Sequence, residues 1–149
     1  MAQTYSSELS GIASNPPVKA SATAAYGARM RRYRATIPLA SQVYGAGNEI
    51  IVAKVPAGLT FAYGIVNTDT SLGTSTIALG SIPAGGSWTT KYLNAQTLTT
   101  TNTATLFSLV SNEDAAAYTA EEVIAVQVLV ANLPASGNLV VDLFFSSPT

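Results

Sequence analysis

Short runs of β-branched and aromatic residues recur along the chain from about residue 28 to its end, and clusters of Gly, Pro, Asn and Thr separate them. Such runs, bounded by turn residues, are typical of β-strands. The pattern therefore predicts an all-β sandwich or barrel. The eight runs are RYRATIPL, NEIIVAKV, LTFAYGIVN, TSTIALG, SWTTKYL, ATLFSLV, EEVIAVQVLVANL and GNLVVDLFF.

The segments between these runs carry the residues that tight turns require. PAG at 56–58, PAGG at 83–86 and PASG at 134–137 each place a proline shortly before a glycine. Proline presets a negative φ and glycine accepts a positive one, so both favour a reversal of the chain. We expect tight turns between strands.

The seventh run is apolar on both sides of the strand it predicts. In a two-layer sandwich only one face of each sheet packs against the core. The second apolar side of this strand must therefore be covered by a loop, by the N-terminal segment or by another subunit. This pattern favours an oligomer. One side would hold Ile124, Val126, Val128 and Val130, and the other Val123, Ala125, Leu129 and Ala131.

A helix over residues 113–131 competes with this strand, because NEDAAAYTAEEV contains good helix formers. The density of β-branched residues from Val123 onward favours a strand there. A short helix near Asp114 to Tyr118 remains compatible with the sequence.

Residues 1–27 are small and polar, contain Pro16-Pro17, and show no sustained period of 2 or 3.6. We interpret them as an extended N-terminal arm, followed by a single β-sandwich domain over residues 28–149. Tyr5, Leu9, Ile12 and Val18 are spaced apolar residues that could anchor the arm on a partner. A floppy terminus without a role is the alternative.

The composition describes a folding chain with little charge. Charged residues make up 10% of the sequence and hydrophobic residues 48%, whereas globular domains carry about 25% charged residues. The net charge of −1 provides no general attraction for nucleic acid or an anionic membrane. No apolar stretch approaches the about 20 residues of a membrane span. We expect a soluble protein that is not processed for secretion.

The residue types that most enzymes use are missing. The chain has no His and no Cys, which excludes imidazole and thiolate chemistry. The adjacent acidic pairs, Glu113-Asp114 and Glu121-Glu122, would point to opposite faces of a strand and could not share acid–base work. The glycines of YGAGNE and PAGGSW lack the setting of a phosphate loop. We expect no enzyme activity, no cofactor and no metal site.

Four of the seven basic residues, Arg29, Arg31, Arg32 and Arg34, lie within six positions. We expect Arg29 and Arg31 to precede the sheet and Arg32 and Arg34 to lie on its outer face, because unpaired guanidinium groups cannot be buried in a core. Alternation then turns Tyr33, Ala35 and Ile37 inward. The arginines would mark the point where the arm meets the sandwich.

These arginines suggest an interface, because arginine pairs bidentately with planar carboxylates. The hypothesis is that at least two of them bind carboxylates across an interface with a neighbouring chain, alongside Tyr5, Leu9 and Ile12 of the arm. The alternative is surface ion pairs within the chain, to Asp142 or Glu49. Nucleic-acid binding would need a broader basic surface with interleaved aromatic residues.

The order of these parts resembles the β-sandwich head decoration (cement) proteins of tailed bacteriophages, on the phrases RRYRATIPLAS, VPAGLTFAYGIVNTDTSLGTSTIALG and LPASGNLVVDLFF. The resemblance implies a jelly-roll-like antiparallel β-sandwich of about eight strands with an extended N-terminal arm. It also implies homotrimers on the capsid exterior that bind the major capsid protein, an arm that engages capsid or neighbour, assembly in the host cytoplasm, and no catalysis, nucleic-acid partner or membrane.

A second interpretation is a glycan- or receptor-binding module from the head or fibre of a phage. Trp88, Tyr92 and Tyr63 could then serve as stacking platforms for sugar rings. Aromatic residues more commonly fill the core. Low charge and the Thr-rich stretch NAQTLTTTNTATL suit a particle component in either case.

Overall fold

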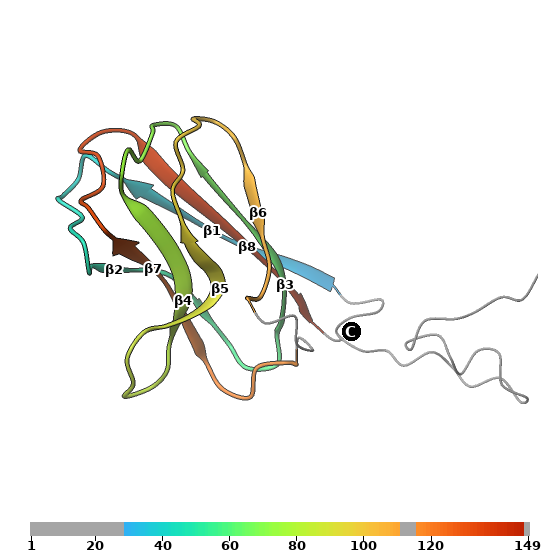
Figure 1. Cartoon of the computed structure of the whole chain (residues 1–149). Coiled ribbons are helices and arrows are strands. Elements are labelled where there is room, and N and C mark those ends of the chain that lie inside the picture. The colour runs from blue at the N-terminus through green and yellow to red at the C-terminus, as the bar shows by residue number, and fades with distance from the viewer. Residues whose placement is uncertain (1–28, 111–115, 148–149) are drawn as a thin grey trace, which may run out of the picture.

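The computed structural model describes residues 29–110 and 116–147, and these form eight β-strands (Figure 1). Each of the eight predicted runs overlaps one strand. The strands are β1 (Arg29–Pro38), β2 (Glu49–Val55), β3 (Thr60–Thr68), β4 (Thr76–Ile82), β5 (Thr89–Gln96), β6 (Thr105–Phe107), β7 (Glu122–Leu129) and β8 (Asn138–Ser147).

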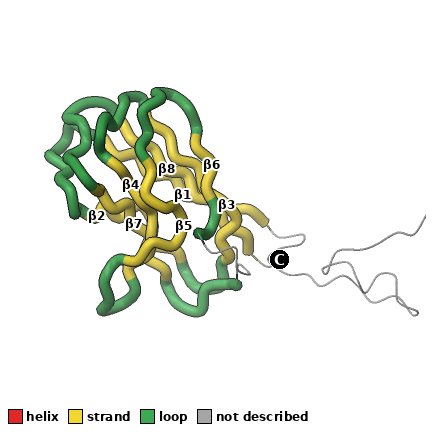
Figure 2. The backbone as a smooth tube through the Cα atoms, viewed as in Figure 1, coloured by secondary structure: helices red, strands yellow, loops and turns green. Residues whose placement is uncertain are grey.

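The strands form two four-stranded antiparallel sheets packed face to face, with strand orders β1-β8-β3-β6 and β2-β7-β4-β5 (Figure 2). Each connection between successive strands passes from one sheet to the other, except the connection between β4 and β5. This is the eight-stranded jelly-roll arrangement of a β-sandwich. The all-β sandwich prediction is confirmed.

A single core lies between the inner faces of the sheets. Aromatic rings crowd its end near the start of β1, where Phe145 contacts Tyr33, Phe61 and Tyr118 edge to face at centroid distances of 5.4, 5.5 and 6.0 Å. Tyr33 and Ile37 point inward, as alternation along β1 predicts. Such aromatic pairs add about 0.5–1.5 kcal/mol each beyond the burial of their area.

The strand predicted from Val123 onward is β7, and its second side is covered partly by a loop of the same chain. Trp88, just before β5, lies against Gly80 and donates a hydrogen bond from Nε1 to the carbonyl oxygen of Ala125 at 3.3 Å. Ala125 is consequently fully buried. Val123 and Leu129, on the same side of β7, remain half-buried.

The prediction that Val130 shares one side of the strand with Ile124, Val126 and Val128 is wrong. Val130 follows the strand, is 77% exposed, and has a φ of 68°. The amide of Ala131 donates to the carbonyl oxygen of Leu129 at 2.8 Å, which closes a three-residue γ-turn around Val130. The buried Ser75 hydroxyl holds this turn by bonding the carbonyl oxygens of Ala131 and Leu129 at 2.7 and 3.3 Å.

Two predictions fall wholly or partly outside the described residues. The arm over residues 1–27, with Tyr5, Leu9 and Ile12, is one of them, and the Asp114 end of the possible short helix is the other. At the other end of that segment, Tyr118 is not helical; its backbone exchanges hydrogen bonds with Gly58 and Leu59. Residues 29–110 and 116–147 contain no helix that could cross a membrane.

Candidate interaction surface

Arg29 and Arg31 belong to β1, so the prediction that they precede the sheet is wrong. Arg29 pairs with Ser147 and Arg31 with Phe145, because β8 is as long as β1 and its ladder reaches the first residue of β1. Both arginines are exposed, at the end of β1 that leads away from the sandwich (Figure 1). Neither forms an ion pair with a carboxylate of the described residues.

Arg32 and Arg34 lie on the outer face of the β1-β8-β3-β6 sheet, as predicted, and both bind Asp142 of β8. Each arginine donates from Nε to Oδ1 and from Nη2 to Oδ2, at 2.8 to 2.9 Å. The Asp142 side chain is only 9% exposed, whereas the two arginine side chains are about half exposed, at 48% and 55%. Ion pairs within the chain, the alternative considered from the sequence, therefore exist, and their partner is Asp142. Glu49, the other carboxylate considered, lies in the other sheet.

These hydrogen bonds change the acidity of Asp142. The donation from Arg32 is the largest cause that lowers the pKa of Asp142, from its ordinary value of 3.8 to about 2, with Arg34 adding to it and partial burial opposing it. The same contact raises the pKa of Arg32. Near neutral pH Asp142 is therefore ionised, and the cluster consists of two positive charges around one negative charge.

The pH dependence of stability should report this cluster. Because the folded pKa of Asp142 lies below its ordinary value, its stabilisation is complete above about pH 4 and is lost as the pH falls through about 2. We expect Asp142→Asn to lower the free energy of unfolding by about 2 kcal/mol at pH 6 and by almost nothing at pH 2. Urea denaturation of both proteins across this range measures the difference, and a difference independent of pH would contradict the assignment.

Aromatic and aliphatic side chains surround the cluster on the same face. Tyr63 stacks on Phe144 with ring centroids 4.6 Å apart and an interplanar angle of 17°, and the Arg32 guanidinium lies 5.9 Å from the Phe144 ring. Met30 is 51% and Leu106 69% exposed. We call this surface the arginine face; the strand pairing brings together Met30, Arg32, Arg34, Tyr63, Ile65, Leu106, Val140, Asp142 and Phe144.

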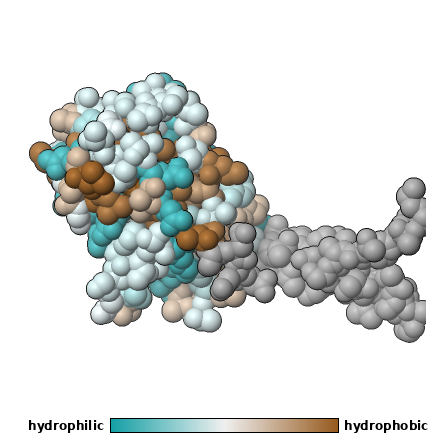
Figure 3. Space-filling model, in the orientation of Figure 1, coloured by the Kyte–Doolittle hydropathy of each residue, from teal (hydrophilic) through white to brown (hydrophobic). Residues whose placement is uncertain are grey.

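The side of the molecule seen in Figure 3 has no comparable single hydrophobic area among the described residues. On this side, hydrophobic residues form several separate patches among polar residues. A scattered pattern of this kind is ordinary for a protein surface, because most surfaces include apolar atoms. The arginine face differs from it in combining exposed apolar residues with a fixed charge cluster.

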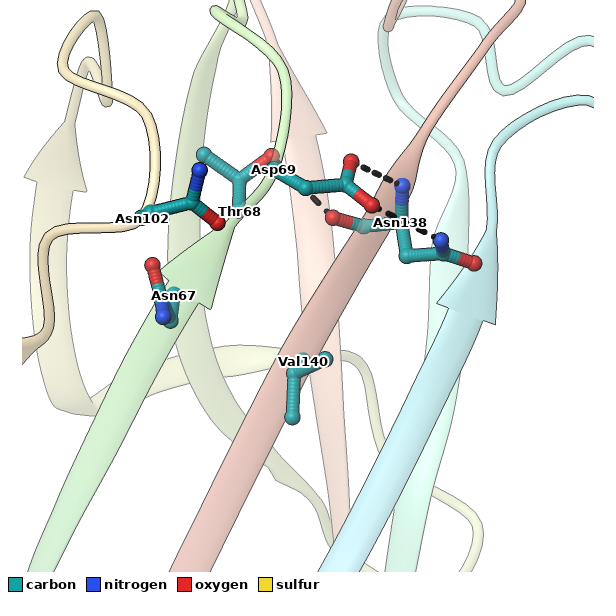
Figure 4. Close-up of a pocket in the computed structure, with 6 residues that line it drawn as sticks. All are labelled: Asn67, Thr68, Asp69, Asn102, Asn138 and Val140. Carbon is teal, nitrogen blue, oxygen red and sulfur yellow. Dashed lines mark hydrogen bonds between the residues drawn. The ribbon is translucent and has the colours of Figure 1, made fainter.

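A depression lies where β3 and β8 meet the loops at the end of the arginine face (Figure 4). It holds about 100 Å³, which is well below the about 300–1,000 Å³ of typical ligand pockets. Asp69 accepts hydrogen bonds from the backbone and side-chain nitrogens of Asn138 at 2.6 and 2.8 Å, and these lower its pKa. Asp69 therefore fixes the start of β8. The lining residues are Asn67, Thr68, Asp69, Asn102, Asn138 and Val140.

The three aromatic residues considered as sugar platforms do not form a common site. Tyr92 is 1% exposed; its hydroxyl lies 2.6 Å from the hydroxyl of Tyr118 and donates to Oε1 of Glu122 at 2.9 Å, so Tyr92 belongs to the core and cannot serve as a platform. Burial raises the pKa of Tyr92 far above its ordinary value. Trp88 packs against β7 of the β2-β7-β4-β5 sheet, whereas Tyr63 lies on the β1-β8-β3-β6 sheet and stacks on Phe144.

The acidic pair Glu121-Glu122 shows no shared chemistry. Glu122 forms an ion pair with Lys91 and accepts the hydrogen bond from Tyr92, while Glu121 precedes β7 and is exposed. Glu113 and Asp114 lie outside the described residues. Within the described ranges, no three acidic side chains gather in a way that could hold a metal ion.

Comparisons with known proteins relate the chain to others through its fold. No family model matches the sequence, and no curated protein matches it. A chain from the capsid of Ralstonia phage GP4 superimposes with a TM-score of 0.62 at 17% identity, covering 83% of this chain and 86% of that one. A chain from the capsid asymmetric unit of cyanophage Pam1 gives 0.58 at 14% identity, with coverage of 83% and 88%.

A third chain, from the acid-stable capsid structure of Helicobacter pylori bacteriophage KHP30, superimposes with a TM-score of 0.55 at 14% identity and covers 80% of this chain and 89% of that one. Identities this low establish a shared fold. Each of the three matches covers 80% or more of both chains, so it joins most of two chains of similar length. The class that the fold defines is therefore a small single jelly roll of the kind found in these phage capsids.

Proposed function

We propose that this chain is a structural virion protein, a decoration or cement protein that binds the outside of a phage head and stabilises it by bridging subunits of the major capsid protein. The observation that carries the proposal is the match over most of the chain to small jelly-roll chains in the capsids of three phages. A fold alone does not define a function. The surface of the chain supplies the further support.

The surface suits repeated weak contacts better than catalysis. The chain carries little charge, and its exposed apolar side chains lie on several elements. The depression at the end of the arginine face is too small for most ligands. On a capsid, many copies of one modest contact add up through multivalency. A non-catalytic role as a component of the particle is consistent with these features.

Homotrimeric assembly is part of the proposal. The outer side of β7 exposes parts of Val123 and Leu129, and Ile51 of the adjacent β2 is 57% exposed. Such residues on a sheet face could pack against a second copy. Sedimentation equilibrium should then show a species of three chains at micromolar concentration, and a single species of 15.3 kDa would contradict it.

The test of the function is reconstitution on particles. Capsids of the encoding phage, prepared without this protein, should bind the purified full chain in co-sedimentation, and binding should saturate at a fixed number of copies. Cryo-electron microscopy of the product should show added density on the outer surface, and the decorated capsids should resist heat better. A protein that stays in the supernatant but is retained on a glycan array would support the receptor-binding alternative.

A further inference from the structure

The arginine face contains more positive charge than its own carboxylate can balance. Arg32 and Arg34 share the single Asp142, which leaves one excess positive charge in the cluster. Arg29 and Arg31 alternate to the other side of β1, where they are exposed at its first residues and form no ion pair with the described residues. In a chain whose net charge is −1, the excess charge of the cluster is a local positive field.

The cluster is also held in a fixed arrangement. Asp142 accepts four hydrogen bonds, two from each arginine, and this bidentate pairing fixes the plane of each guanidinium. The Nη1 group of each arginine donates to none of the described residues. Because the arginines are about half exposed, these N–H groups can reach a partner without first losing side-chain freedom.

The apolar part of the face is equally unusual for a free surface. The Tyr63–Phe144 stack forms a flat aromatic area beside the charge cluster, and Leu106 projects from β6 on the row that also contains Ile65 and Asp142. Aromatic residues and arginine are the types that dominate the energetics of protein interfaces. An apolar area flanked by fixed arginines fits a protein partner that presents both apolar and acidic side chains.

We propose that the arginine face is the surface that docks on the capsid, with a carboxylate of the partner bound to the Nη1 groups of Arg32 and Arg34 and apolar side chains of the partner on Tyr63, Phe144 and Leu106. This inference rests on the proposed function and assigns the surface that performs it. Asp142 acts as a positioning residue, because it fixes the two arginines that meet the partner.

The charge of the arginine face favours an acidic protein partner over a second copy of this chain or a nucleic acid. A two-fold contact between two arginine faces would bring like charges together, so a second copy in that arrangement is disfavoured. Nucleic acid would need several phosphate contacts over a longer footprint, whereas this face offers two fixed arginines. An acidic protein surface matches the charge, the bidentate geometry and the apolar area together.

Paired substitutions test the inference in the co-sedimentation assay with capsids that lack the protein. Leu106→Glu places a negative charge on the face without disturbing the core, since Leu106 is 69% exposed; we expect capsid affinity to fall at least tenfold with an unchanged thermal melt. Val43→Glu is the matched control, because Val43 is 73% exposed in the loop between β1 and β2. Its affinity should stay within twofold.

A second pair tests the charge. Arg34→Gln removes the excess cation and should weaken binding about tenfold, with a smaller dependence of the affinity on NaCl between 50 and 500 mM than the wild type shows. Lys54→Gln removes the same charge from the exposed side of β2, in the other sheet. Because Lys54 pairs with Val123 of the proposed trimer contact, sedimentation must first show that this variant keeps the oligomeric state of the wild type; both properties should then be unchanged. Melting curves of both variants confirm that the fold is intact.

The outcomes separate the two proposals. Wild-type protein that binds capsids while Leu106→Glu and Arg34→Gln bind equally well overturns this inference and leaves the proposed function in place. If Val43→Glu loses binding while Leu106→Glu and Arg34→Gln retain it, the docking surface lies at the loop between β1 and β2, and this inference is overturned. Wild-type protein that binds no capsid overturns both proposals. An arginine-dependent complex with duplex DNA in place of capsids would identify a nucleic-acid partner and overturn the inference.

Discussion

Phe145→Ala should destabilise the fold by about 3–5 kcal/mol and lower the melting temperature by about 10 °C or more. Phe145 is fully buried, and the rings of Tyr33, Phe61 and Tyr118 all contact it at the aromatic end of the core. Alanine would leave a cavity that three rings on three different segments cannot close together. Thermal melting followed by circular dichroism measures the loss.

The neighbouring residue provides the control. Phe144 lies on the opposite side of β8, half-buried on the arginine face, where it touches Tyr63 and Arg32. Phe144→Ala should cost only about 1 kcal/mol of stability, because no enclosed cavity forms, but it should weaken capsid binding. Equal destabilisation by the two substitutions would contradict the assignment of inner and outer faces to β8.

Gly80→Ala should destabilise the protein by about 3 kcal/mol through overpacking. A Cβ at Gly80 in β4 would overlap the carbonyl oxygen of Thr89 in β5 and would meet the Trp88 ring at 2.7 Å. The backbone of β5 cannot move aside without breaking its pairing with β4, and Trp88 would leave its place over Ala125. The midpoint of urea denaturation should fall, and Trp88 fluorescence should shift toward that of an exposed indole.

Gly45→Ala is the matched control for this substitution. A Cβ at Gly45 would lie 3.4 Å from the Asn132 side chain, which is ordinary contact. The stability should change by less than about 0.5 kcal/mol, or rise slightly, because alanine reduces the freedom of the unfolded chain. If Gly45→Ala were as destabilising as Gly80→Ala, the effect would come from loss of glycine in general and not from the close approach of β4 and β5.

The sequence by itself determined the approximate positions of the strands and, in β1, the side that faces the core. Local features carry this information: β-branched runs have a period of two, and proline–glycine segments separate them. Alternation along β1 was sufficient to turn Tyr33 and Ile37 inward and Arg32 and Arg34 outward. The same local reasoning predicted the strand β7 in preference to a helix.

Only the tertiary structure decided which of these residues meet. Asp142 is 108 positions from Arg34 in the chain, and it became the shared partner of two arginines because β8 pairs with β1 in one particular register. The length of β8 likewise brought Arg29 into the sheet. Pairing register and strand length depend on contacts between distant segments, and a pattern read along one strand contains no information about its neighbour.

The ends of strands and the depth of burial depended on the same distant contacts. Val130 continues the apolar pattern of β7, yet Ser75 from another segment holds it in an exposed turn. The local sequence around Tyr92 does not show whether its ring is exposed or buried. In the structure Phe61 packs on the ring at a centroid distance of 4.8 Å, and the Tyr118 hydroxyl contacts the Tyr92 hydroxyl, so Tyr92 is enclosed. The sequence determined local conformation, whereas burial and partnership arose from the packing of the two sheets, because both are properties of pairs of segments that the chain brings together only on folding.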